Sequence, residues 1–138
     1  MRTTLNWLTP LLALPLIVGG CDDTIFGKGT SGDSGNSYVD GYEGVVAIAD
    51  DHCVSCHPSG GGSGGLDLES DLCGTTVGVS AQDYDGILVV AGDHASSVLW
   101  NKMADTGSYG GVMPLGGGLS SDVVAIVEAW IDDGASCN

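Results

Sequence analysis

The chain has 138 residues and a formal net charge of −15, because 18 acidic residues face only three lysines and arginines. Nucleic-acid binding and attraction to anionic lipid head groups both need a basic surface, so these two classes of function are excluded. The length predicts one small domain. Glycine supplies 24 residues and aromatic residues only 6 %. Such a chain makes a weak apolar core unless a further group supplies buried surface.

The first twenty residues have the pattern of an export signal. Arg2 precedes an almost wholly apolar run, Leu5 to Val18, which is too short and too proline-interrupted for a membrane-spanning helix. The sequence Val18-Gly19-Gly20-Cys21 resembles the lipobox of bacterial lipoproteins. This resemblance implies cleavage before Cys21 and acylation of its thiol, which would anchor the protein to a membrane in the periplasm or at the cell surface. Plain secretion, with a coincidental cysteine, is the alternative.

Residues 21–37 follow as a Gly/Ser-rich flexible tether, and residues 38–138 form the domain. A short helix is expected near the start of the domain, since Tyr42, Val45, Val46 and Ala49 have helical spacing. A Gly/Ser loop follows at residues 60–65. Residues 87–90 are an extended run or the start of a helix.

Two helices are expected in the second half of the domain. Asp93 is placed to cap a helix over Ser96–Met103, in which Val98, Leu99 and Met103 face inward. A second Gly-rich loop covers 109–118. Ser120 or Ser121 then caps the last helix, and Gly134 ends it. The apolar stripe of this helix consists of Val123, Val124, Ile126, Val127, Trp130 and Ile131. The fold class is therefore mainly α, with three to four helices and long Gly-rich loops.

The motif that indicates chemistry is Cys53-Val54-Ser55-Cys56-His57, the C-x-x-C-H attachment signature of c-type haem. On a helical turn, Cys53 and Cys56 face the same way, so both thiols reach the two vinyl groups at one edge of a haem. His57 follows directly, which lets its imidazole bind the iron from one side. We therefore predict one covalent haem c, with His57 as an axial iron ligand.

Two other uses of this motif are possible. A structural zinc site needs four ligands, usually two such pairs, and Cys73 and Cys137 do not form a second pair in the sequence. A thioredoxin-like redox pair needs a βαβ context, of which the sequence has no sign.

The second axial ligand has four candidates in the mature chain: His52, His94, Met103 and Met113. Met113 is favoured, because its Gly-rich loop allows a thioether to approach the iron closely. Met103 lies at an inward helix position and is expected in the core. His94 is expected to be a surface or cap residue. His52 abuts Cys53 and is expected to be exposed.

The five cysteines divide into three groups. Cys21 takes the lipid, whereas Cys53 and Cys56 take the haem. An oxidising compartment favours pairing the remaining two, so we predict a disulfide between Cys73 and Cys137. Two free buried thiols are the alternative.

The order of motifs along the domain resembles that of small single-haem class I cytochromes c. Its pieces are the C-V-S-C-H motif, Gly65-Leu66-Asp67-Leu68, Val90-Ala91-Gly92-Asp93 with Ser97-Val98-Leu99, Met113-Pro114, Leu119-Ser120 and Trp130–Ala135. The resemblance implies thioether bonds at Cys53 and Cys56, a proximal His57 and a distal Met113. The chain departs from the pattern in two respects, since it lacks a ring of lysines for docking and adds Cys73 and Cys137.

A haem with two axial protein ligands predicts an electron carrier rather than an enzyme. The acidic charge predicts redox protein partners with basic docking faces. A haem peroxidase or gas-binding sensor, with an exchangeable distal ligand, is the alternative, and a zinc-binding structural module is a further one. The haem is also expected to complete the core by packing against five side chains: Leu66, Leu68, Leu99, Trp100 and Trp130.

Overall fold

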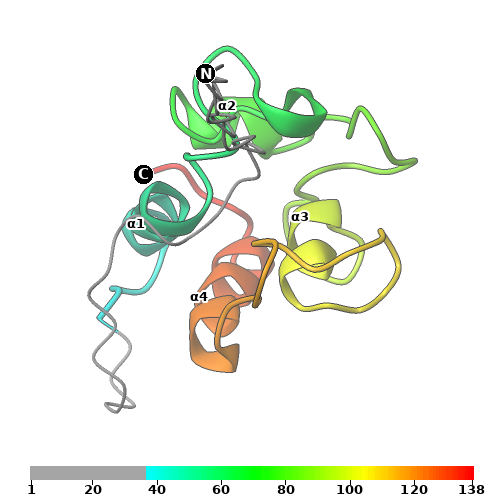
Figure 1. The fold of residues 1–138 in the computed structure, drawn as a ribbon. Helices are drawn as coiled ribbons and strands as arrows, with labels where there is room; N and C mark the ends of the chain where they lie inside the picture. Colours follow the sequence, from blue (N-terminus) through cyan, green and yellow to red (C-terminus); the bar gives the residue numbers. More distant parts are fainter. Residues whose placement is uncertain (1–36) are drawn as a thin grey trace, which may run out of the picture.

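A computed structural model describes residues 37–138, so the expected signal segment, Cys21 and nearly all of the tether lie outside the described residues. The described part is mainly helical, which confirms the mainly-α fold class. Its elements are α1 (Tyr42–His52), the 3-10 turn η2 (Ser63–Gly65), α2 (Leu72–Thr76), α3 (Val98–Met103) and α4 (Ser121–Asp132) (Figure 1). None of these helices has the length and apolar character that crossing a bilayer requires.

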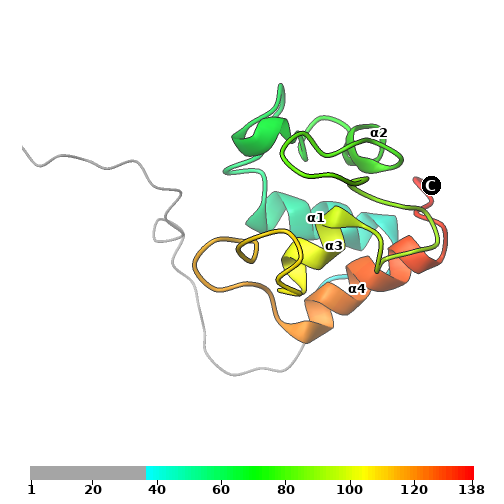
Figure 2. The same ribbon diagram turned by 90° about the vertical axis from the view of Figure 1, so that its right-hand side faces the viewer.

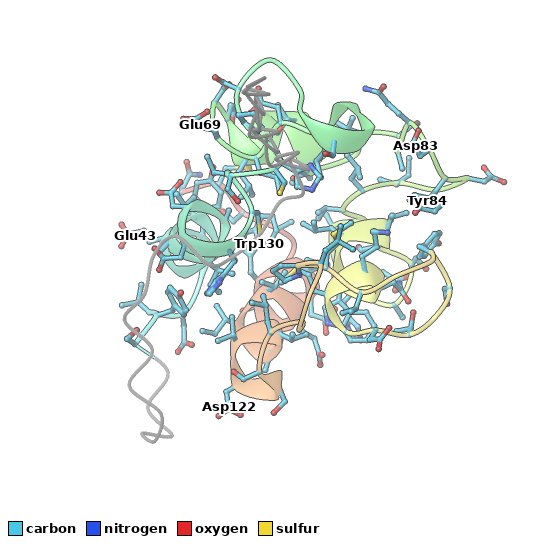
Figure 3. All side chains as sticks on the ribbon, viewed as in Figure 1. Glu43, Glu69, Asp83, Tyr84, Asp122 and Trp130 are labelled. Carbon is cyan, nitrogen blue, oxygen red and sulfur yellow. A yellow bond between two sulfur atoms is a disulfide. The ribbon has the colours of Figure 1, made fainter. Side chains whose placement is uncertain are left out.

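Helix α4 is the centre of the packing, because it lies against both α1 and α3 (Figures 1 and 2). The predicted stripe is largely buried, with Ile131 and Val127 fully enclosed, whereas Val123 is only half-buried. Trp130 lies between α4 and α1 (Figure 3), and its ring centroid is 6.0 Å from that of Tyr42. Helices α1 and α4 thus supply much of the buried core.

Gly44 of α1 has a packing role that its low helix propensity conceals. A Cβ atom at this position would collide with the main-chain oxygen of Val39 and would lie 3.4 Å from Ile126 Cγ2 on α4. The segment before the helix therefore folds back onto Gly44. The buried face of α1 accordingly consists of Gly44, Val45, Ile48 and Ala49, rather than the predicted Tyr42, Val45, Val46 and Ala49.

The segment before α3 is extended, which decides between the two readings of residues 87–90. Ile87 pairs with Ser80 and with Ser97 in isolated bridges, and Val89 pairs with Val77. Helix α3 consequently begins at Val98, two residues later than predicted. The carboxylate of Asp93 accepts a hydrogen bond from the Ser96 N–H at 3.0 Å, so it caps the turn before the helix and not the helix itself.

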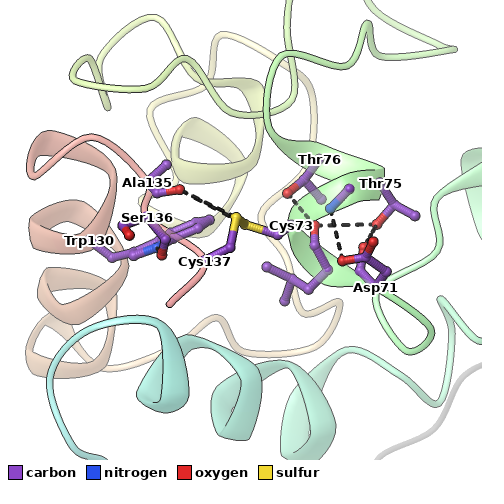
Figure 4. The surroundings of a disulfide bond; sticks show 10 residues. Asp71, Cys73, Thr75, Thr76, Trp130, Ala135, Ser136 and Cys137 are labelled. Atoms are coloured by element: carbon purple, nitrogen blue, oxygen red, sulfur yellow. Dashed lines mark hydrogen bonds between the residues drawn. A yellow bond between two sulfur atoms is a disulfide. The ribbon is translucent and has the colours of Figure 1, made fainter.

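The C-terminal tail is joined to α2 by a disulfide between Cys73 and Cys137, the two cysteines that the sequence analysis paired (Figure 4). Their Cα atoms are 6.0 Å apart. The indole Nε1 of Trp130 donates a hydrogen bond to the Ser136 main-chain oxygen at 2.8 Å. A covalent bond and a polar contact from the core thus hold the last residues in place.

Candidate functional site

A cavity of about 280 Å³ lies between two walls that are distant in the sequence. One wall comes from the end of α1 and the segment up to residue 68, and the other comes from α3 and the segment up to residue 115. The loop 81–88 lines it as well. Its lining includes both cysteines of the motif, His57 and Met113. Its apolar side chains include Leu66, Leu68, Leu88, Val98, Leu99 and Met103.

The motif wall is built on the C-terminal end of α1. The Cys53 N–H donates to the Ala49 main-chain oxygen at 2.8 Å, and the N–H groups of Cys56 and His57 donate to the Cys53 oxygen at 3.0 and 2.9 Å. Cys53 is the C-cap of α1, and the last two bonds close a separate turn directly after the helix. Burial raises the pKa of the Cys53 thiol to about 11, so this thiol is protonated at neutral pH. The turn brings both cysteines to the cavity.

The segment after the motif packs closely against it. The Ser63 N–H donates to the Cys56 oxygen at 3.0 Å, and the Leu68 N–H donates to the His57 oxygen at 3.0 Å. Gly62 permits this approach, since a Cβ there would collide with the Cys56 oxygen and lie 2.6 Å from Pro58 Cδ. The predicted Gly/Ser loop therefore serves to fix the backbone of the motif.

His57 is half-buried, and its Nδ1 atom is buried without a hydrogen-bond partner of acceptable geometry. Burial lowers the pKa of His57, the Lys102 ammonium lowers it further, and the nearby Ser63 main chain opposes both. The neutral imidazole that this shift favours is the form that binds a metal ion.

Asp67 organises the loop that follows His57. Its carboxylate accepts hydrogen bonds from the N–H groups of Gly60, Glu69 and Ser70 and from the Ser70 hydroxyl, at 2.7 to 3.0 Å. These bonds, led by those from Ser70, lower the pKa of Asp67 to about 2. One carboxylate thus ties together both ends of the loop.

Asp67→Asn is expected to destabilise the folded protein at neutral pH, because an amide offers one acceptor oxygen to these donors. In the wild type, Asp67 makes its full contribution to the free energy of unfolding above about pH 4, where the unfolded aspartate is ionised. This contribution is lost as the pH falls towards about 2. The variant should therefore lose less stability over this window. Urea unfolding followed by circular dichroism measures the effect, with Asp40→Asn as a control for charge. Identical acid sensitivity in Asp67→Asn and wild type would contradict this role.

The opposite wall carries Met113 in a segment without helix. Met113 is half-buried, and its N–H donates to the main-chain oxygen of Lys102 on α3 at 2.9 Å. The peptide bond between Met113 and Pro114 is cis. Met103 is 7 % exposed in the core and also lines the cavity, so it has the core position expected of it.

The two other histidines differ in their position relative to the cavity. His52 was expected to be exposed, but it is half-buried at the end of α1, where it also lines the cavity and its Nε2 lies 2.9 Å from the Tyr38 hydroxyl. His94 lies outside the cavity lining, and its Nδ1 is 2.8 Å from the Asp132 carboxylate. This carboxylate is the main cause that raises the pKa of His94.

The two tryptophans expected to pack on the haem do not line the cavity. Trp130 lies in the core against Tyr42, and the Trp100 ring packs edge-on against His94 with centroids 4.5 Å apart. Their packing against a haem stays a prediction, because helical periodicity says which residues turn inward but not which space they reach. The leucines Leu66, Leu68 and Leu99 do line the cavity, as expected.

Lys102 and Tyr84 are cavity residues that the sequence analysis missed. Lys102 lies one helical turn after Val98, so its spacing places it on the inward face of α3. Lys102 is also the one lysine or arginine in residues 37–138. A single positively charged residue at an inward helix position is the feature of the sequence by which Lys102 could have been found.

The residues present fit a haem. Two cysteines, an imidazole with an unpartnered buried nitrogen and a methionine line one largely apolar cavity. Elsewhere in the described part, His94, Glu128 and Asp132 form a group with ligand atoms within 4.8 Å of one another, but it includes no residue of the Cys53–His57 motif. Comparisons with protein-family models, with curated proteins and with solved structures find no match for this chain.

Proposed function

We propose that this protein is a one-electron carrier that holds a single covalent haem c in the cavity. The observation that supports this function best is the convergence of two distant segments. Cys53, Cys56 and His57 line the cavity from one wall, and Met113 lines it from the other. A motif that matched by chance would not require a methionine from a remote loop to share its cavity.

Each side chain has a distinct role in this proposal. Cys53 and Cys56 would hold the haem covalently, each through one thioether bond to a vinyl group. His57 and Met113 would hold the haem iron, His57 from the wall that carries the motif and Met113 from the other wall. Haem supplies a reversible Fe(III)/Fe(II) couple when it is bound. The apolar side chains of Leu66, Leu68 and other residues keep water from the site, and the Met113 thioether favours the reduced state.

A peroxidase or a gas-binding sensor is the second candidate, since the same haem could serve either. Both functions need a distal position that a small molecule can occupy. The main chain of Met113 is held by Lys102 on α3, and the side chain is half-buried. Because this attachment keeps Met113 in place, it favours the electron carrier, which needs no open position for a small molecule.

The sequence supports two further proposals about the setting of this function. Acylation of Cys21 would tether the carrier to a membrane on the exported side, in the periplasm or at the cell surface. Fifteen acidic residues against one lysine in residues 37–138 favour redox partners with basic docking faces. Association with them should slow as the salt concentration rises.

The decisive experiment uses the mature protein, produced in a host that attaches c-type haem. We expect a red protein whose colour remains with the polypeptide after acidic acetone extraction and whose band on a denaturing gel stains for haem. The oxidised protein should show the weak long-wavelength band of a methionine–Fe(III) bond. Colourless protein, or pigment that acidic acetone removes, would overturn the proposal, and bound zinc in its place would favour the structural module.

A further inference from the structure

Lys102 makes an unusual set of contacts in the wall of the cavity. It is half-buried on α3, and its Nζ donates hydrogen bonds to the Tyr109 main-chain oxygen at 2.9 Å and to the Tyr84 hydroxyl at 3.1 Å. The Nζ also lies 4.6 Å from the centroid of the Tyr84 ring, within the range of a cation–π contact. No acidic side chain pairs with this ammonium group within the described part of the chain. Its Nζ instead contacts two tyrosines, one through the main chain and one through the side chain.

These contacts join two loops that border the cavity. Tyr84 belongs to the loop 81–88, which Figure 3 shows beside α3, and Tyr109 begins the segment that leads to Met113. The two tyrosine rings meet edge to face, with centroids 5.7 Å apart. Through its own main-chain oxygen, Lys102 also accepts the hydrogen bond of the Met113 N–H. Lys102 therefore holds the Met113 segment (residues 109–118) at two points, Tyr109 and Met113.

The Met113 segment needs such support because of its composition. It has no helix, and glycines occupy positions 110, 111 and 116–118. Glycine-rich backbone loses much conformational freedom when it is fixed, so its own residues do little to hold it in one place. A thioether stays on a metal only while the backbone keeps it there, and an external ligand binds in proportion to the fraction of molecules in which it has left.

We infer that Lys102 is a positioning residue for the distal ligand: with Tyr84 and Tyr109 it forms a clasp that keeps the Met113 segment against the cavity. This inference rests on the proposed haem function. The clasp residues do not themselves contact the reacting atoms. Its role is to set how readily Met113 gives way to an external ligand.

The test is an imidazole titration of the oxidised, haem-containing protein, because imidazole binds Fe(III) only where methionine has left. Lys102→Met removes the ammonium group but keeps an unbranched apolar chain. Loss of charged hydrogen bonds of this kind should tighten imidazole binding by about 10- to 100-fold. The methionine–Fe(III) band should weaken in parallel. Met113→Ala removes the methionine ligand altogether and so gives the imidazole affinity of a protein with no competing thioether.

Three measurements separate positioning from general destabilisation. Lys102→Arg keeps the charge and should stay close to wild type. Tyr84→Leu changes an exposed side chain that leaves the Lys102–Tyr109 bond intact, so it should shift imidazole affinity in the same direction by less, and it decides the question if Lys102→Met fails to fold. Urea midpoints by circular dichroism show whether the shift exceeds any change in global stability.

The outcomes distinguish this inference from the function on which it rests. A haem-containing wild type with a methionine band, whose imidazole affinity is unchanged by Lys102→Met, would overturn the clasp and leave the electron carrier standing. Wild type without covalent haem would overturn both. An affinity shift that Lys102→Arg shows as strongly as Lys102→Met would also overturn the clasp.

Discussion

Protein that carries Cys53→Ser together with Cys56→Ser is expected to contain no covalent haem. Serine hydroxyls do not add to vinyl groups under the conditions that thiols do, and both attachment points of the cavity wall are then lost. Haem staining on a denaturing gel and the mass of the intact chain measure the result. The apolar cavity would be left without its occupant, so we also expect a large loss of helix by circular dichroism.

The chain provides its own matched control for this prediction. Cys73→Ser with Cys137→Ser removes the same number of sulfur atoms from the same domain, yet it should leave the haem attached. Haem that stays bound to the Cys53→Ser, Cys56→Ser protein through acidic acetone would contradict the assignment of the motif. Loss of haem from both double variants would point instead to a general failure of folding.

The same Cys73→Ser, Cys137→Ser variant should be less stable than the wild type by about 4 kcal/mol. The disulfide closes a loop with a sequence separation of 64 residues, and its removal returns that conformational freedom to the unfolded chain. Urea unfolding under non-reducing conditions measures the difference. The Trp130–Ser136 hydrogen bond is retained, so the tail should still dock in the folded state.

Reduction offers an independent check of this second prediction. Wild type in excess dithiothreitol should move to the unfolding midpoint of the double variant, whereas the variant itself should not respond. Equal stability of the oxidised wild type and the variant would show that the cross-link does not stabilise the domain.

The long periodic segments were the predictable part of the fold. The stripe of α4 runs over three turns, so the sequence analysis identified its buried face and its end at Gly134. Helix α2 was missed, because it has only five residues and contains Gly74. It is capped by Asp71, whose carboxylate accepts a hydrogen bond from the Gly74 N–H at 3.0 Å. One capped turn is too short for periodicity to reveal.

Features that depend on close approach were mispredicted for a different reason. Gly44 counts against a helix by propensity, but in the folded chain it admits the Val39 backbone against α1. The start of α3 shifted to Val98 since the Ser97 hydroxyl accepts a hydrogen bond from the Val90 N–H at 2.8 Å and keeps that residue outside the helix. Such contacts arise between segments, and no local pattern encodes them.

For the candidate site, the sequence identified the residues whose chemistry has a fixed spacing or few competitors. Cys53, Cys56 and His57 form a motif, and Met113 was one of few methionines. Lys102 and Tyr84 have neither property. Their contact joins helix α3 to a loop that is distant in the sequence, so only the fold shows that they act together.

Two long-range contacts each close a large loop of this domain, and the two loops overlap along the chain. The cavity brings residues 52–68 against residues 98–115, and the disulfide links Cys73, which lies between those segments, to Cys137, which lies beyond both. Neither of these two loops lies within the other, so neither half of the domain can unfold while the other half remains folded. The domain should therefore open as one cooperative unit, and a partly unravelled form that exposes the cavity alone should be scarce.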